Sequence, residues 1–148
     1  EVLFCQVALR PGRPLAVGRL DAGRPAQAPG CLLLGLPGNP VATMVTFLAL
    51  VRPTLLAMMG VAGAQARTPL LQARCQETLR KKPGRTEYQR GIVERAPDGQ
   101  LQVRTTGQQG SGVLSSMHQA NGLIVLRHEQ GAVAVGDTVE VMVFDGVI

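Results

Sequence analysis

The sequence predicts an α/β segment followed by a small all-β domain. The first observation is the turn GLPGNP at residues 35–40, which lies between an apolar run at 31–34 and an almost uncharged, helix-like stretch at 41–59. The second is a series of short segments beyond residue 69, several of them alternating and separated by Gly- and Pro-containing turns, as in a small barrel or sandwich. Small and polar residues at 61–68 indicate a linker between the two parts.

The first part, residues 1–60, begins with two strand-like stretches joined by the turn RPGRP, which predicts a hairpin. A loop, a buried strand and a helix that ends at Gly60 are expected to follow. Because a proline inside a helix removes a hydrogen bond, Pro53 should kink that helix or divide it. The expected elements are strands at 2–9 and 15–20, a loop at 21–30, a strand at 32–36 and a helix at 40–59.

The second part, residues 69–148, is expected to be built from strands and one short helix. Residues 135–143 (VGDTVEVMV) alternate after a Gly-Asp turn, as a half-buried strand does. The expected strands are 70–79, 86–95, 101–106, 123–127 and 138–144, with a helix at 113–120. Residue 1 already lies in a strand-like run, so we expect the chain to begin within a domain, as a fragment of a longer protein.

The net charge of +5 and a dense group of basic residues at 67–95 favour an anionic partner. Aromatic residues make up only 3% of the 148 residues, which disfavours stacking on nucleic-acid bases and favours a small anion. The three cysteines are far apart, which favours reduced thiols in a cytoplasmic protein over a disulfide or a zinc site. Prolines and glycines interrupt the longest uncharged stretch, at 26–51, so no membrane span is expected.

The turn at 35–40 has the chemistry of a helix start. Asn39 is a favoured N-cap, Pro40 a favoured first helical residue, and the next amides should have no backbone partner. Since no acidic residue follows in 41–59, the helix start could bind an anion, although a well-made turn that binds nothing is the alternative. Antiparallel strands would bring Arg10 and Arg13 beside this turn, and two fixed cations would strengthen such a site.

Other motifs are weaker. The loop GQQGSG at 107–112 could form a backbone anion site or be a plain turn, and it is not a phosphate loop of the Walker type because no lysine follows. Arg85 and Arg90 flank TEYQ on an expected strand, where surface charge is the simplest interpretation. No Ser-His-Asp or Cys-His arrangement and no pair of carboxylates spaced for acid–base catalysis is evident.

Five segments together resemble the MoeA family, the molybdopterin molybdotransferases that include the E domain of gephyrin. They are VALRPGRPLAVG, GLPGNPVATMVTF, GRTEYQRGIVER, TTGQQGSGVLSSMHQANGLIVL and VGDTVEV, in the family's order over almost the whole chain. The resemblance implies that residues 1–60 end a molybdopterin-binding, MogA-like α/β domain and that a C-terminal β-barrel follows. It also implies an enzyme that inserts molybdate into adenylated molybdopterin and releases AMP, with Mg²⁺, as a cytoplasmic homodimer.

The family's functional positions are carried over residue by residue. The resemblance matches the family's functional turn to Pro37, Gly38, Asn39 and Pro40. It matches the family's basic turn to Arg10 and Arg13, and two barrel positions associated with activity to Arg90 and Ser111. Ala42 replaces a serine that is frequent in the family. The family's Asp- and Gly-rich substrate motifs, with the carboxylates expected to hold Mg²⁺, are absent here, so the fragment alone should be inactive. A non-enzymatic interaction or dimerisation module is the alternative, and RNA binding by the basic barrel is a third hypothesis.

Overall fold

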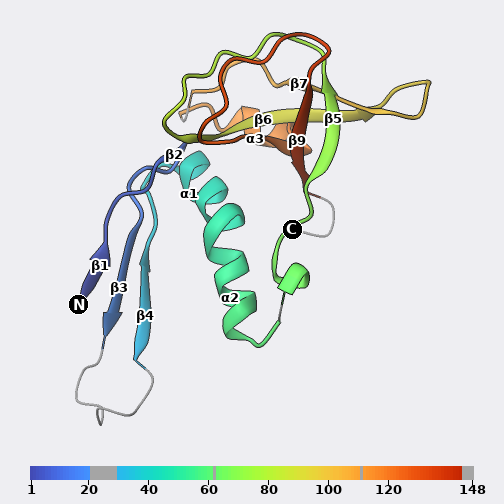
Figure 1. Cartoon of the computed structure of the whole chain (residues 1–148). Helices are drawn as coiled ribbons and strands as arrows, with labels where there is room; N and C mark the ends of the chain where they lie inside the picture. The colour runs from blue at the N-terminus through green and yellow to red at the C-terminus, as the bar shows by residue number, and fades with distance from the viewer. Residues whose placement is uncertain (21–29, 62, 111, 145–148) are drawn as a thin grey trace.

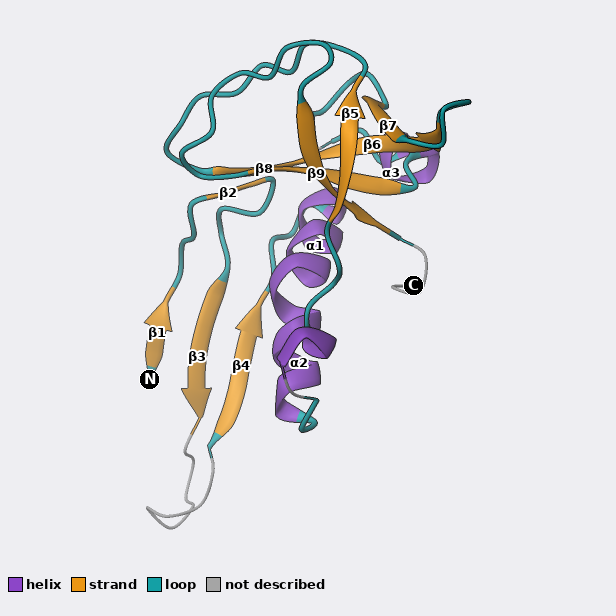
Figure 2. Cartoon of the chain, turned by 45° about the vertical axis from the view of Figure 1, so that its right-hand side comes forward, coloured by secondary structure: helices purple, strands orange, loops and turns teal. Residues whose placement is uncertain are grey.

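A computed structural model describes residues 1–20, 30–61, 63–110 and 112–144. A small antiparallel sheet and a long helical segment stand side by side below a β-barrel (Figure 1). The same arrangement is seen after a 45° turn, where the helical segment runs from beside β4 up to the barrel (Figure 2). The expected loop at 21–30 falls outside the described residues except for Gly30.

The small sheet has the order β1-β3-β4, with both pairs antiparallel. Its strands are β1 (Val2–Phe4), β3 (Ala16–Leu20) and β4 (Cys31–Gly35), so the expected hairpin and returning strand are both present. The strand expected at 2–9 is wrong as a single element. It breaks after β1, and a separate strand β2 (Leu9–Arg10) pairs in parallel with the start of β6 (Thr86–Arg95) in the barrel.

The helical segment runs without interruption through three pieces: α1 (Pro40–Thr46), the π-helical turn η1 (Phe47–Val51) and α2 (Arg52–Met58). The widened turn lies immediately before Pro53, whose ring lacks an N–H and crowds the preceding turn of a regular α-helix. The segment ends as expected at Gly60, which adopts a positive φ of 86°. The amide of Val61 bonds the carbonyl of Leu56 at 3.0 Å, as a Schellman cap requires.

The second part is a barrel, which decides between the two all-β alternatives. Five of the described strands pair in the cyclic order β6-β7-β5-β9-β8 and back to β6. Besides β6, they are β5 (Leu71–Cys75), β7 (Leu101–Thr105), β8 (Gly122–Leu126) and β9 (Thr138–Val143). A short helix, α3 (Ser115–Gln119), precedes β8, and the 3₁₀ turn η2 (Gly63–Ala66) precedes β5. The expected strands therefore agree with the structure to within a few residues.

Two apolar clusters meet at strand β8, all of whose residues are buried. Ile124 and Leu126 point into the barrel, whereas Leu123 and Val125 point outward onto the helical segment, because successive side chains of a strand face opposite sides. The outer cluster joins Val41, Val45 and Leu48 of the helical segment to the barrel residues Met117, Leu123, Val125 and Met142. The barrel thus covers one face of the helix.

The opposite face of the helical segment and much of the small sheet are exposed. Met44, Phe47 and Met58 are 37%, 38% and 63% exposed, and Leu33 of β4 is 49% exposed, so β4 is not the buried strand expected within this chain. The run Pro40–Met58 is long and apolar enough to cross a membrane by length and composition, a property that core helices share. Here its residues Val41, Val45 and Leu48 pack against the barrel.

Candidate anion-binding cleft

A cleft of about 1250 Å³ lies where the small sheet, the start of the helical segment and the barrel meet. Its walls are the segment 6–14, the turn at 37–39, and the barrel segments 77–80, 84–85, 87–90 and 105–110. The described lining carries five arginines against two glutamates; the arginines are Arg10, Arg13, Arg80, Arg85 and Arg90. A cleft with this surplus of cations attracts anions.

The turn at 37–39 is a capped helix start. Asn39 is the N-cap, and its Oδ1 accepts a hydrogen bond from the amide of Ala42 at 3.2 Å. The amide of Thr43 donates to the carbonyl of Asn39 at 2.8 Å, and the hydroxyl of Thr43 donates to the carbonyls of Pro37 and Asn39. The expectation that these amides have no partner is therefore wrong for Ala42 and Thr43. Pro37, Gly38 and Asn39 line the cleft, whereas Pro40 begins α1 behind it.

The basic turn lies against the helix. Gly12 has a φ of 117°, and a Cβ placed there would come within 2.3 Å of the Thr46 Oγ1 of α1. Only glycine fits such a close approach with this backbone conformation. Arg10 and Arg13 flank this glycine and both line the cleft. The Nη2 of Arg13 donates to Gln6 Oε1 at 3.1 Å, and no carboxylate among the described residues pairs with Arg13.

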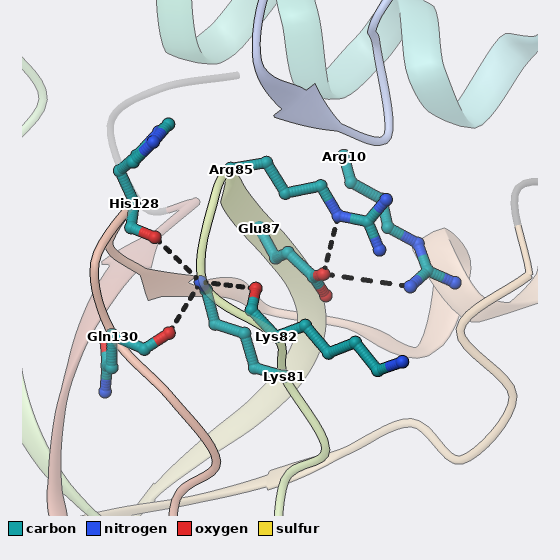
Figure 3. Close-up of polar contacts among 7 residues, drawn as sticks. All are labelled: Arg10, Lys81, Lys82, Arg85, Glu87, His128 and Gln130. Carbon is teal, nitrogen blue, oxygen red and sulfur yellow. Dashed lines mark hydrogen bonds and ion pairs between the residues drawn. The ribbon is translucent and has the colours of Figure 1, made fainter.

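A buried carboxylate connects two of the arginines. The side chain of Glu87 is 4% exposed, and its Oε1 lies 2.9 Å from Arg85 Nε and 3.7 Å from Arg10 Nη1 (Figure 3). Arg10 stands opposite Glu87 in the β2–β6 pairing. No sequence motif singled out Glu87. The signal available was an acidic residue two positions after Arg85 on an expected strand, which places both side chains on the same face.

A buried ammonium holds the loop that carries Arg80 and Arg85. Lys81 is 7% exposed, and its Nζ donates to the carbonyls of Lys82 at 3.2 Å, His128 at 3.3 Å and Gln130 at 2.8 Å (Figure 3). The amide of Gly84 also bonds the carbonyl of His128, at 3.0 Å. These bonds tie the loop before β6 to the loop after β8. In the sequence, Lys81 was only one member of a basic run, and nothing there signalled its burial.

Arg90 lies at the back of the cleft and is 1% exposed. Its Nε donates to Ser116 Oγ at 2.9 Å, and its Nη2 donates to the carbonyls of Gln108 at 3.3 Å and Gly110 at 3.0 Å. Burial lowers the pKa of this guanidinium from its ordinary value, and the positive charge of Arg10 lowers it further. Two carbonyls of this glycine-rich segment, those of Gln108 and Gly110, therefore accept hydrogen bonds from the Arg90 guanidinium. Ser111, predicted at this site, lies outside the described residues.

Family and structure comparisons agree on this chain. Residues 72–144 match the family model described as MoeA C-terminal region (domain IV). The chain is 35% identical over 145 residues to the molybdopterin molybdenumtransferase of Haemophilus influenzae, covering 98% of this chain and 34% of that protein. It is 30% identical over 152 residues to gephyrin of Dictyostelium discoideum, covering 94% of this chain and 21% of that protein.

The fold has counterparts among solved structures. The molybdopterin biosynthesis MoeA protein of Pyrococcus horikoshii matches with a TM-score of 0.73 at 23% identity, over 97% of this chain and 32% of that one. A molybdenum cofactor biosynthesis protein of Pyrococcus furiosus matches with a TM-score of 0.71 at 24% identity, over 97% and 45%. The chain spans about one third of the length of the Haemophilus relative. Residues 72–144 thus match MoeA domain IV, and the chain is similar to a molybdopterin molybdenumtransferase along nearly its whole length.

Proposed function

We propose that the protein carrying this chain is a molybdopterin molybdenumtransferase that acts in molybdenum cofactor biosynthesis. Relatives with that name match nearly the whole chain. The observation that carries the proposal is the cleft with its surplus of arginines. Molybdate and a pterin phosphate are both anions, and fixed cations are what such ligands require.

In this proposal the enzyme inserts molybdate into adenylated molybdopterin with release of AMP, and this chain supplies one wall of the site. Arg13 and Arg10 hold anionic oxygens of molybdate or of the pterin phosphate. Asn39 holds the turn in shape by capping α1. Positioning and charge stabilisation supply the rate enhancement, without a covalent nucleophile. Residues 1–60 end the molybdopterin-binding α/β domain of MogA type, and residues 69–148 form the barrel domain.

The remaining expectations also belong to the proposal: the protein is a cytoplasmic homodimer, and the chain is inactive without the rest of the protein. The carboxylates of the cleft do not fit Mg²⁺. Glu87 is paired with two arginines, and Glu77 accepts a hydrogen bond from the amide of Thr105. No group of three or more His, Cys, Asp or Glu that could hold a metal occurs among the described residues. Accordingly, no catalytic step is assigned to Mg²⁺ on these residues.

The test is steady-state molybdate insertion by the full-length protein. Arg13→Ala should raise the KM for molybdate at least about tenfold, because one charge-assisted contact contributes roughly 1.5–3 kcal/mol. Arg95→Ala is the matched control, since its guanidinium bonds the carbonyl of Gly99 on the barrel surface and does not line the cleft. If Arg13→Ala and Asn39→Ala both leave insertion unchanged, the assignment of the site is wrong.

A second candidate function is an interaction or dimerisation module without enzymatic activity. The exposed apolar face of the helical segment, with Phe47 and Leu55, favours it because large apolar areas on a surface mark contacts with other chains. Sedimentation of the full-length protein separates this candidate from a monomeric enzyme. A strictly monomeric protein would count against the module and against the proposed homodimer.

A further inference from the structure

Glu87 places a negative charge in a cleft whose charged lining consists mostly of arginines. It is 4% exposed on its side chain, and burial of an unpaired carboxylate would be strongly unfavourable. Two cations satisfy it: Arg85 through Nε at 2.9 Å and Arg10 through Nη1 at 3.7 Å. Figure 3 shows both guanidinium groups turned toward this one carboxylate from different chain segments.

We propose that Glu87 is a positioning residue: its carboxylate holds Arg10 and Arg85 in place at the cleft wall, ready to bind a tetrahedral oxyanion. This inference rests on the proposed function and deepens it. Arg85 is held through its inner Nε and Arg10 through one terminal nitrogen, Nη1, and with side chains 44% and 56% exposed both keep further N–H groups accessible. Holding a long side chain before the ligand arrives removes most of the entropy that it would lose on binding.

The carboxylate also joins the two parts of the chain. Arg10 lies on β2, which comes from the segment before the helix, whereas Arg85 and Glu87 belong to the barrel. Backbone pairing places Arg10 opposite Glu87, and the amide of Thr86 donates to the carbonyl of Ala8 at 2.9 Å. One buried charge therefore fixes the distance between two cations of the cleft lining that come from different segments of the chain.

Positioning and simple charge make opposite predictions, which allows a clean test. A carboxylate near an anion site repels the anion, so its removal would strengthen anion binding if charge alone mattered. If Glu87 holds the arginines, its removal releases them and weakens binding, although the cleft becomes more positive. The variant Glu87→Gln removes the charge and keeps the shape and one oxygen acceptor.

The experiment uses the full-length protein and sodium molybdate as the probe. The dissociation constant of molybdate is measured by calorimetry, and KM and kcat are measured with adenylated molybdopterin. Glu87→Gln is compared with Glu94→Gln, the same change on the same strand at an exposed residue that pairs with Arg104 at 3.5 Å. The Glu94 variant changes the net charge by the same amount and serves as the control.

For Glu87→Gln we expect the dissociation constant and the KM for molybdate to rise at least about fivefold, with kcat changing much less. Glu94→Gln should behave as the unaltered protein, and Glu87→Asp should recover part of the loss because it restores the charge. A purely structural role would lower the active fraction and leave KM unchanged, which would overturn the proposal, as would equal or tighter binding.

Two further results keep the test decisive. If Glu87→Gln does not fold, Arg85→Lys replaces it, since lysine keeps the charge and loses the planar group that meets the carboxylate. An unchanged KM in Arg85→Lys would then overturn the proposal, and a raised KM would support it. If the unaltered full-length protein neither binds nor inserts molybdate, the proposed function fails, whereas a working protein with an indifferent Glu87 means that only the positioning role fails.

Discussion

The buried guanidinium of Arg90 forms hydrogen bonds that stabilise the fold. This guanidinium contacts Ser116 and the carbonyls of Gln108 and Gly110, so the cation holds residues 108–110 against the barrel. The family resemblance placed Arg90 among the anion-binding residues. The contacts assign it at least a second task, because its Nε and Nη2 donors are already engaged within the fold.

Arg90→Ala should lower the free energy of unfolding by about 2–4 kcal/mol, because it leaves buried acceptors without a donor. Arg104→Ala should cost at most about 0.5 kcal/mol, because its pair with Glu94 is exposed to solvent. Urea unfolding of both variants measures the difference. A stable Arg90→Ala protein that no longer binds molybdate would instead make Arg90 a ligand of the anion.

At the same scale, the sequence located some site residues and missed others. Arg10, Arg13 and Asn39 could be placed because short motifs fix their local geometry. Lys81 could not, because its burial depends on acceptors from distant chain segments. The burial of Glu87 likewise depends on β2, which carries Arg10, although its other partner, Arg85, is only two residues away. Lys81 finds its acceptors at residues 128 and 130, and nothing near Lys81 in the sequence announces them.

At the level of elements, the start of α1 tests whether Asn39 is a cap, a ligand or both. Asn39→Ala should lower the free energy of unfolding by about 1 kcal/mol through loss of the bond to the amide of Ala42. Asn39→Asp keeps an acceptor, so stability should be retained while its negative charge weakens molybdate binding. Thermal unfolding and calorimetry separate the two effects. If both variants bind molybdate as tightly as the unaltered protein, the turn is not part of the anion site.

The elements that the sequence predicted poorly are those with irregular backbone. The apolar run at 2–9 gave no sign of the break after β1, where the amide of Leu9 bonds the carbonyl of Val7 in a tight turn. Pro53 predicted a disturbance of the helix, and the structure absorbs it in η1. By contrast β6 was predicted to the residue, since its turns on either side contain Pro and Gly.

For the whole molecule, closure of the barrel and its packing on the helical segment could not be derived from the sequence. The strands were visible, and β6 and β7 form a local hairpin, but the first half of β6 pairs with β8, more than 30 residues further along the chain. The apolar face of the helix was recognised, whereas its partner surface on β8 was not. A uniformly apolar strand does not reveal which element covers its outer side.

The folded molecule should lose stability in alkali. Burial raises the pKa of the Cys75 thiol from its ordinary 9.0 and that of the Tyr88 phenol from its ordinary 10.0. Above about pH 9 the unfolded chain therefore releases protons that the folded chain retains, so unfolding becomes easier as pH rises. Urea unfolding at about pH 8 and about pH 10.5 measures the loss. The variant Cys75→Ala/Tyr88→Phe should lose less over this range, and an equal loss would exclude these two groups as the cause.

The pairing of β2 with β6 has a consequence for dividing the chain. A protease that nicks the segment 61–68 separates the sequence into two pieces, yet β2 stays attached to the barrel through its backbone bonds. The outer apolar cluster, with Val41 and Val45 on one piece and Leu123 and Val125 on the other, holds them together as well. The two parts are therefore suited to split-protein complementation, as halves that reassemble without a peptide bond between them.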